Sequence, residues 1–215
     1  MSLKVNEIFF SIQGESSHAG RPCAFIRLAG CNLRCSYCDT RYAYEEGTVQ
    51  EISEIERQIR SFDCRLVEIT GGEPLLQAET PELIRRLLDR DYTVLMETNG
   101  SLDIGGIDKR CVRIVDVKCP SSGESEKNRL ENLAIITPND EVKFVIGDRN
   151  DFDYAKGIIS AHLSGREGLK PPLISPVFGR IDPEILARWI LEDHLDVRLQ
   201  IQLHKVIWGA ETRGV

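Results

Sequence analysis

Short apolar runs along this chain alternate with longer segments in which apolar residues recur every three or four positions. The short runs predict buried strands, and the longer segments predict amphipathic helices. Strands are predicted at residues 25–28, 66–70, 93–98, 112–118, 142–146 and, with strict alternation, 197–203. Helices are predicted at residues 48–62, 80–88 with Thr80 as the N-cap, 152–163 and 182–191. The polar stretch 121–132 shows neither pattern and is expected to form a loop or a poor helix.

Strands that alternate with helices of this length indicate βαβ units and a parallel sheet. A complete eight-stranded α/β barrel needs about 250 residues, whereas this chain has 215. We therefore expect an α/β fold with an incomplete, partial TIM-like barrel of parallel strands, built as a single domain over residues 1–215. Functional groups in such folds lie at the C-terminal strand ends. The candidates at those ends are Thr70, Gly71, Gly72, Glu97, Asp116, Lys118 and Ser175.

Composition narrows the class of protein. The chain has 27 Lys and Arg against 34 Asp and Glu, a formal charge of −7, with 41% hydrophobic and 28% charged residues. This composition is typical of a globular domain. The acidic balance argues against direct binding to nucleic acid or to an anionic membrane. The first residues lack a signal-peptide pattern, and no apolar run approaches the length of a membrane span, so we expect a cytoplasmic protein.

The seven cysteines are the most informative residues of the composition. An odd number without an export signal argues against a disulfide scaffold and favours metal binding or thiolate chemistry. Three of them, Cys31, Cys35 and Cys38, lie within eight residues in the pattern CxxxCxxC. The other four lie in apolar segments and are expected to be small buried residues. These four are Cys23, Cys64, Cys111 and Cys119.

Three closely spaced thiolates can bind one compact metal centre. Structural zinc sites and ferredoxin-type clusters normally use four ligands. The nearest histidines, His18 and His162, lie outside conventional spacing. Three ligands fit a 4Fe–4S cluster with one iron left open for a small molecule. A zinc site completed by a distant residue remains an alternative.

The CxxxCxxC pattern resembles the defining motif of the radical S-adenosylmethionine (SAM) superfamily, and the segment 70–74, TGGEP, is similar to the loop that meets the SAM ammonium group in that superfamily. Glycine permits such close backbone approach. The resemblance implies a 4Fe–4S cluster and SAM as cofactors. It also implies that SAM is cleaved to a 5′-deoxyadenosyl radical, which abstracts a hydrogen atom.

Further segments resemble the 7-carboxy-7-deazaguanine synthase family. They are residues 7–16 with FSIQGE, residues 31–40 with CNLRCSYCDT, and residues 199–209 near the end of the chain. This resemblance implies a lyase of queuosine biosynthesis, and so of a tRNA modification pathway. Such an enzyme rearranges 6-carboxy-5,6,7,8-tetrahydropterin into 7-carboxy-7-deazaguanine, with release of ammonia and assistance from Mg²⁺. A homodimer and a reductant such as flavodoxin are also implied.

Site residues can be assigned to these tasks. Arg27 lies in an apolar strand, where an unpaired charge is costly, and its planar guanidinium suits a substrate carboxylate. A buried ion pair is the alternative for Arg27. The N-terminal segment 1–30 is expected to bind substrate, and the resemblance implies that the substrate contacts are Ile12, Gln13, Gly14, Glu15, Arg27, Thr70 and Glu97. Cys31, Cys35 and Cys38 would bind the cluster, and Thr40 would contact Mg²⁺.

The remaining assignments concern SAM. The predicted contacts are Gly72, Asp116, Lys118, Ser175, Pro176, Val177 and Phe178. His204 and Lys205 either close the substrate side or face solvent. Two rival functions remain open: an activase that installs a glycyl radical on a protein, and an electron-transfer or zinc-binding module. The first needs an open face for a protein substrate, and the second needs four metal ligands.

Overall fold

The computed structural model describes all residues from 1 to 215 and contains one nine-stranded sheet. Its strands follow the order β3-β1-β2-β4-β5-β6-β7-β8-β9, and the two edges, β3 and β9, do not pair with each other. The six strands from β4 to β9 each pair in parallel with the preceding member of the sheet, while β1 is antiparallel to β2 and to β3. The expected α/β fold with an open, partial barrel is confirmed.

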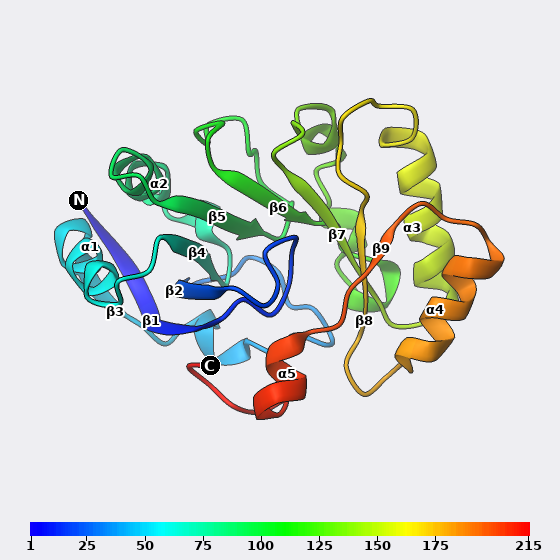
Figure 1. Cartoon of the computed structure of the whole chain (residues 1–215), viewed down its shortest axis with the longest axis horizontal. Helices are drawn as coiled ribbons and strands as arrows, with labels where there is room; N and C mark the ends of the chain where they lie inside the picture. Colours follow the sequence, from blue (N-terminus) through cyan, green and yellow to red (C-terminus); the bar gives the residue numbers. More distant parts are fainter.

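Nine strands and five α-helices make up the fold (Figure 1). The strands are β1 (Ser2–Ile12), β2 (Pro22–Leu28), β3 (Thr48–Glu51), β4 (Leu66–Gly71), β5 (Thr93–Thr98), β6 (Val112–Asp116), β7 (Glu141–Ile146), β8 (Leu173–Pro176) and β9 (Arg198–Leu199). The helices are α1 (Ile52–Ser61), α2 (Thr80–Leu88), α3 (Arg149–His162), α4 (Pro183–Glu192) and α5 (Leu203–Trp208). No helix is both long and apolar enough to cross a membrane.

Two expectations about secondary structure were wrong. Residues 48–51 extend as strand β3 along β1, so the first helix begins only at Ile52. Strand β9 stops after two residues because Gln200 and Gln202 turn inward, and residues 203–208 form α5. The polar stretch 121–132 forms a loop with short 3₁₀ turns at 120–122, 125–127 and 130–134, in agreement with the expected loop or poor helix. Strand β1, for which no prediction was made, pairs with both β2 and β3.

Two smaller expectations also need correction. Glu79 is the N-cap of α2, because Thr80 is already helical and its hydroxyl instead donates to the carbonyl oxygen of Pro74 at 2.6 Å. Cys23, Cys111 and Cys119 are buried as expected, whereas Cys64 is only half-buried.

Two apolar cores cover the outer face of the sheet. Helices α1 and α2 pack on β1, β2, β4 and β5, and helices α3 and α4 pack on the β6–β8 side (Figure 1). A third, smaller core lies elsewhere and contains Phe9, Cys23, Phe25, Leu66, Leu95, Val112 and Ile114. Side chains alternate between the two faces of a strand. Leu66 therefore shares the inner face with Glu68 and Thr70, and Leu95 shares it with Glu97, so the inner face changes from apolar to charged within two residues.

Candidate active site

A cavity of about 600 Å³ occupies the inner face at the C-terminal strand ends. It is lined from above by the loop after β2, which contains all three motif cysteines, and by residues 70–72. It is lined more deeply by Glu15, Glu68, Glu97 and Lys143. We call residues 30–40 together with 71–73 the rim. We call Gln13, Glu15, Glu68, Glu97 and Lys143 the floor.

Backbone contacts position the cysteine loop. The Gly30 amide donates to the carbonyl oxygen of Ala43 at 2.8 Å. Within the motif, the Ser36 amide donates to the carbonyl oxygen of Ser122 at 2.9 Å, and its hydroxyl donates to that of Ser121 at 2.7 Å. The turn after β6 therefore supports the loop between Cys35 and Cys38.

Cys31, Cys35 and Cys38 are free, half-buried thiols that line this one cavity, and no other cysteine lines it. Burial is the main cause that raises the pKa of Cys35, to about 11, so a metal centre must displace the proton to bind the thiolate. No three Cys, His, Asp or Glu side chains converge on a single metal position. The donor set nevertheless suits an iron–sulfur cluster with three protein ligands, because the three thiols share one loop and are the only cysteines that line the cavity.

Packing requires glycine at positions 71 and 72 of the rim. A Cβ atom on Gly72 would lie 1.9 Å from the carbonyl oxygen of Gly30, and one on Gly71 would lie 2.1 Å from that of Leu28. The Gly72 amide donates to Leu28, and the Glu73 amide donates to Gly30. Both amides are therefore engaged within the chain. An ammonium group is a hydrogen-bond donor, so it would bind to carbonyl oxygens of this loop.

Glu73 organises the neighbouring strand end. Its fully buried carboxylate accepts hydrogen bonds from the Leu75 amide at 3.0 Å, the Thr98 hydroxyl at 2.8 Å and the Asn99 amide at 2.7 Å. The Asn99 side chain in turn donates to the sulfur of Cys31 at 3.8 Å. Sequence reasoning assigned no role to Glu73 or Asn99, although Asn99 follows a strand end and so lay where functional groups were expected.

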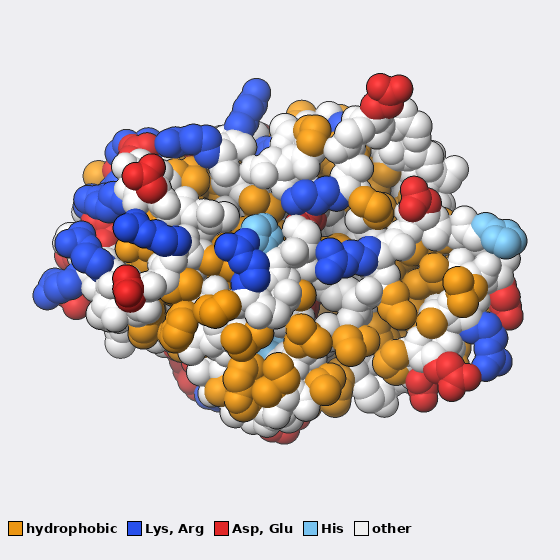
Figure 2. Space-filling model, viewed as in Figure 1, with side chains coloured by type: hydrophobic (Ala, Val, Ile, Leu, Met, Phe, Trp, Pro, Cys, Tyr) orange, Lys and Arg blue, Asp and Glu red, His pale blue; other side chains and the backbone are white.

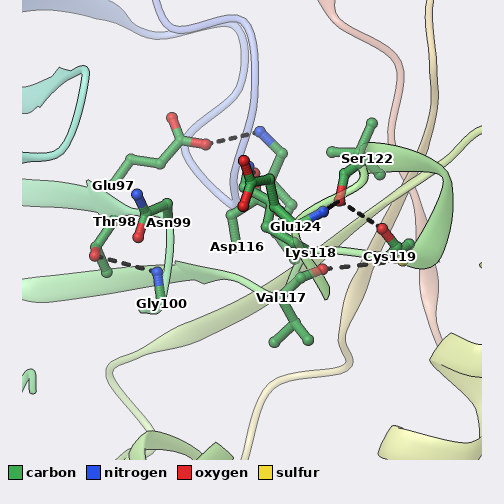
Figure 3. A network of polar contacts seen from close by, with 12 residues as sticks. Glu97, Thr98, Asn99, Gly100, Asp116, Val117, Lys118, Cys119, Ser122 and Glu124 are labelled. Atoms are coloured by element: carbon green, nitrogen blue, oxygen red, sulfur yellow. Dashed lines mark hydrogen bonds and ion pairs between the residues drawn. The ribbon is translucent and has the colours of Figure 1, made fainter. Parts of the chain in front are cut away.

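The predicted SAM contacts divide into two groups. Asp116 and Lys118 lie together at the end of β6, with Lys118 Nζ 2.6 Å from Asp116 Oδ2 (Figure 3). Asp116 Oδ1 is buried without a hydrogen-bond partner, although the residue lines the cavity. An unpartnered acceptor of this kind fits a ligand with hydroxyl or ammonium donors. Val177 and Phe178 also line the cavity, but Ser175 and Pro176 do not.

Arg27 both forms an ion pair and faces the cavity. Its Nε donates to Glu7 Oε1 at 2.7 Å, and its guanidinium lies 5.6 Å from the ring centre of Phe9 and 5.8 Å from that of Tyr42. The two terminal nitrogens donate to no protein acceptor, since the bond to Glu7 is the only one that Arg27 makes through its side chain. Arg27 can therefore accept a carboxylate while Glu7 fixes its orientation.

The floor is a layer of buried charge. Lys143 lies between the carboxylates of Glu15 and Glu97, at 2.8 Å from Glu97 Oε1. Burial would lower the pKa of Lys143, but these two carboxylates raise it well above its usual value. Beside them, the Gln13 amide donates to Glu68. Sequence reasoning missed Glu68 and Lys143, whose only signal was a charged residue inside each of two apolar strands.

The QGE turn also closes the open side of the barrel. Glu15 accepts hydrogen bonds from Gln202 at 2.5 Å and from Gln200 at 3.2 Å, and the Leu203 amide donates to the carbonyl oxygen of Gly14 at 3.1 Å. A Cβ on Gly14 would lie 2.1 Å from His204 Nδ1, so glycine makes room for α5. The N-terminal turn and the segment 200–205 thereby join across the gap between β1 and β9, and we call this junction the seam.

The other residues predicted for the site also lie at this cavity. Ile12 and Thr70 line it, as does Thr40, whose hydroxyl donates to Asp39 Oδ1 at 2.9 Å. His204 and Lys205 line it as well and do not face solvent alone. Residues 210–215 complete the lining, with the guanidinium of Arg213 3.8 Å from the ring centre of Tyr42.

The chain is similar to proteins of known class. The sequence model described as the radical SAM superfamily matches residues 25–162. Proteins named 7-carboxy-7-deazaguanine synthase are similar over nearly the whole chain. One from Chlorobaculum tepidum is 49% identical, covering 99% of this chain and 97% of its own. Another, from Koribacter versatilis, is 44% identical, covering 99% and 100%.

Solved structures support the fold. The crystal structure of QueE from Escherichia coli has a TM-score of 0.73 and 19% identity, and the match covers 94% of each chain. Streptococcus suis SuiB, in the crystal structure bound to S-adenosylmethionine, has a TM-score of 0.58 and 13% identity over 83% of this chain and 50% of its own. At these identities the two likenesses show a shared fold.

Proposed function

This chain belongs to the 7-carboxy-7-deazaguanine synthases of the radical SAM superfamily, and we propose that its cavity binds 6-carboxy-5,6,7,8-tetrahydropterin beneath the cysteine loop. Membership makes it an enzyme that uses a 4Fe–4S cluster and SAM. The reaction of the family is a ring contraction to 7-carboxy-7-deazaguanine with loss of ammonia, a lyase step in queuosine biosynthesis.

The observation that carries the proposal is that one cavity is lined by groups suited to the cluster, to SAM, to a carboxylate and to N–H donors. Cys31, Cys35 and Cys38 at the rim would bind the cluster, and Gly72, Asp116 and Lys118 beside them would bind SAM. Arg27 offers two free guanidinium nitrogens to a carboxylate, and the floor offers carboxyl groups to N–H donors. When bound, the cluster and SAM supply a 5′-deoxyadenosyl radical. The closed floor and seam would exclude water from that radical.

Thr40 is proposed to contact Mg²⁺, together with oxygen atoms of the substrate. Mg²⁺ prefers oxygen ligands and keeps several waters, so one hydroxyl is a sufficient protein contribution. Thr40 lines the cavity, close to the cysteine loop. Flavodoxin as reductant, a homodimeric assembly and a cytoplasmic location are further parts of the proposal, carried by the family resemblance.

The test of the function is a direct assay. Cluster-reconstituted protein is incubated without oxygen with the carboxytetrahydropterin, SAM, Mg²⁺ and a reductant, and the deazaguanine chromophore is recorded. Arg27→Ala is expected to bind cluster and SAM normally but to lose at least about tenfold in kcat/KM, since a charged hydrogen-bond pair contributes roughly 1.5–3 kcal/mol. Thr40→Ala is expected to need more Mg²⁺ for half-maximal rate. Absence of product from the wild type would refute the proposal.

A further inference from the structure

Glu68 is a buried acid on the inner face of β4, and the proposed function gives a role to the floor as a whole but none to Glu68 individually. The residue is 5% exposed, and it lines the cavity. Its Oε2 accepts from the side-chain amide of Gln13. Its Oε1 accepts no hydrogen bond from the protein and is not fully buried, so a ligand in the cavity can reach it.

Glu68 lacks the cation that the neighbouring acids have. Lys143 contacts Glu15 and Glu97, and no lysine or arginine lies within ion-pair distance of Glu68. Burial is the main cause that raises the pKa of Glu68, to about 8, and the nearby charge of Glu97 adds to it. A buried acid that the fold leaves without a cation is typical of a binding or catalytic site, because an apolar side chain would be less costly there.

The position of Glu68 relative to Arg27 defines two ends of the cavity. In the parallel pair of β2 and β4, Arg27 lies opposite Thr70 and Phe25 lies opposite Glu68. Glu68 is therefore one side-chain layer deeper than Arg27, about 7 Å along the strand direction. A ligand held at Arg27 by a carboxylate would extend its other end toward Glu68.

Glu97 is less suited to the same task. Its Oε1 already accepts from Lys143 at 2.8 Å, and this lysine neutralises it. Burial would raise the pKa of Glu97, but Lys143 lowers it, so the charge of this carboxylate is compensated within the protein. Of the two acids on β4 and β5, Glu68 is the one that has no cation of its own.

We propose that the Glu68 carboxylate recognises adjacent N–H donors at the inner end of the substrate heterocycle, opposite the carboxylate bound by Arg27. The chemical class is the amino-pyrimidinone edge, in which a ring N–H and an exocyclic amine point the same way and match the two oxygens of a carboxylate. The side-chain amide of Gln13 orients Glu68. When the ligand binds, Gln13 either gives up its hydrogen bond to Glu68 or keeps it beside the ligand. This inference rests on the proposed function and adds to it the group that selects the heterocycle.

The test measures binding without turnover. The holoenzyme, with cluster and SAM but no reductant, is titrated with 6-carboxy-5,6,7,8-tetrahydropterin and with its analogue lacking the exocyclic amine. The wild type is expected to bind the analogue about 10- to 100-fold more weakly, as for the loss of one charged hydrogen bond. Glu68→Gln is expected to bind the true substrate weakly and to lose this discrimination.

A matched control variant tests whether Glu68 recognises the substrate or only supports the turn that carries Gln13. Glu141 accepts from the amide and the hydroxyl of Ser17, so it fixes the turn that carries Gln13 from outside the cavity. Glu141→Gln is expected to keep the wild-type ratio of affinities for substrate and analogue. If Glu141→Gln abolishes the ratio as Glu68→Gln does, Glu68 acts only as a support for the loop, and the inference is wrong.

Proton release gives a second readout on the unmodified enzyme. At pH 7 a carboxyl group with a pKa of about 8 is mostly protonated, so pairing as a carboxylate should release up to about one proton per substrate. The groups that face Glu68 are Glu97, Glu15, Lys143 and the Cys23 thiol, whose raised pKa keeps it neutral. Calorimetry in two buffers of different ionisation enthalpy measures the release, and Glu68→Gln should abolish it.

The outcomes separate failure of the proposed function from failure of the role proposed for Glu68. If the wild type does not bind the carboxytetrahydropterin at all, the proposed function fails. If it binds and turns over this substrate but binds the analogue equally well, the function stands and the role of Glu68 is refuted. This comparison uses the wild type alone, so it decides even if Glu68→Gln does not fold.

Discussion

The rim and the floor of the cavity are held in place by different kinds of interaction. At the rim, main-chain amides of Gly30, Gly72 and Glu73 donate to main-chain carbonyl oxygens, and the cysteine side chains form no disulfide. In the floor, side chains bind side chains, with Lys143 between two carboxylates and Gln13 on a third. The difference teaches that the rim can lose a ligand side chain without losing its shape, whereas the floor depends on its charges.

The largest expected effect is the loss of chemistry without loss of fold at the rim. Cys35→Ala removes a half-buried thiol that makes no hydrogen bond within the protein. We expect no detectable turnover and no stable cluster, because two cysteines cannot replace three. The free energy of unfolding of the cluster-free protein should change by less than about 1 kcal/mol. Iron and sulfide analysis and urea unfolding measure the two quantities.

Cys64→Ala is the matched control. Cys64 is also a half-buried thiol, but it does not line the cavity. This variant should retain its iron and its turnover. A Cys35→Ala protein that unfolds as easily as a floor variant would contradict the proposed independence of the rim.

The rim was also the part of the site that could be predicted from sequence. Cys31, Cys35 and Cys38 lie within eight residues, and Gly72 belongs to a second short motif directly after a strand, so their shared cavity could be expected from local patterns. The parallel strands followed from apolar runs of clear length. The fold class could be argued from these local signals because each strand and helix is specified by neighbouring residues.

The floor could not be predicted in the same way. Glu68 and Lys143 are 75 residues apart in the sequence, and only the folding of the whole sheet brings both to the floor. The same holds for the seam, where Glu15 meets Gln200 and Gln202. The alternating pattern after residue 197 suggested a long strand, since nothing local shows that its glutamines turn inward to a distant carboxylate.

The second prediction concerns the stability of the floor. Lys143→Met removes the cation between Glu15 and Glu97 and leaves both carboxylates near Glu68 without compensation. Breaking a buried ion pair costs about 3–5 kcal/mol, so we expect a loss of that order in the free energy of unfolding at pH 7. Urea unfolding of the cluster-free protein measures it.

The loss should depend on pH with a definite sign. Although burial alone would raise the pKa of Glu97, Lys143 lowers it in the folded state. Its contribution to stability is therefore present above the pKa of the unfolded state, near 4.3, and disappears as the pH falls through the folded value. The difference between wild type and Lys143→Met should shrink below about pH 4. The double variant Lys143→Met/Glu97→Gln should recover part of the stability, and no recovery would contradict the ion-pair explanation.

The smallest expected effect concerns the backbone of the rim. Because main-chain contacts hold the rim in place, a change that disturbs one of these contacts should alter its shape. The Cβ atom introduced by Gly72→Ala would lie 1.9 Å from the Gly30 carbonyl oxygen, so the two backbone segments must separate. Such overpacking costs about 1–3 kcal/mol.

Gly157→Ala is the control, because Gly157 lies in helix α3 and no atom lies within 4 Å of the Cβ that alanine would add. Alanine there should stabilise the protein by up to about 1 kcal/mol. Opposite shifts in urea midpoint, with weaker SAM binding only in Gly72→Ala, would show that the main chain sets the shape of the rim. A Gly72→Ala protein with wild-type stability and SAM affinity would show instead that the cysteine loop can move away from β4 at no cost, and the distinction between a backbone-held rim and a charge-held floor would then fail.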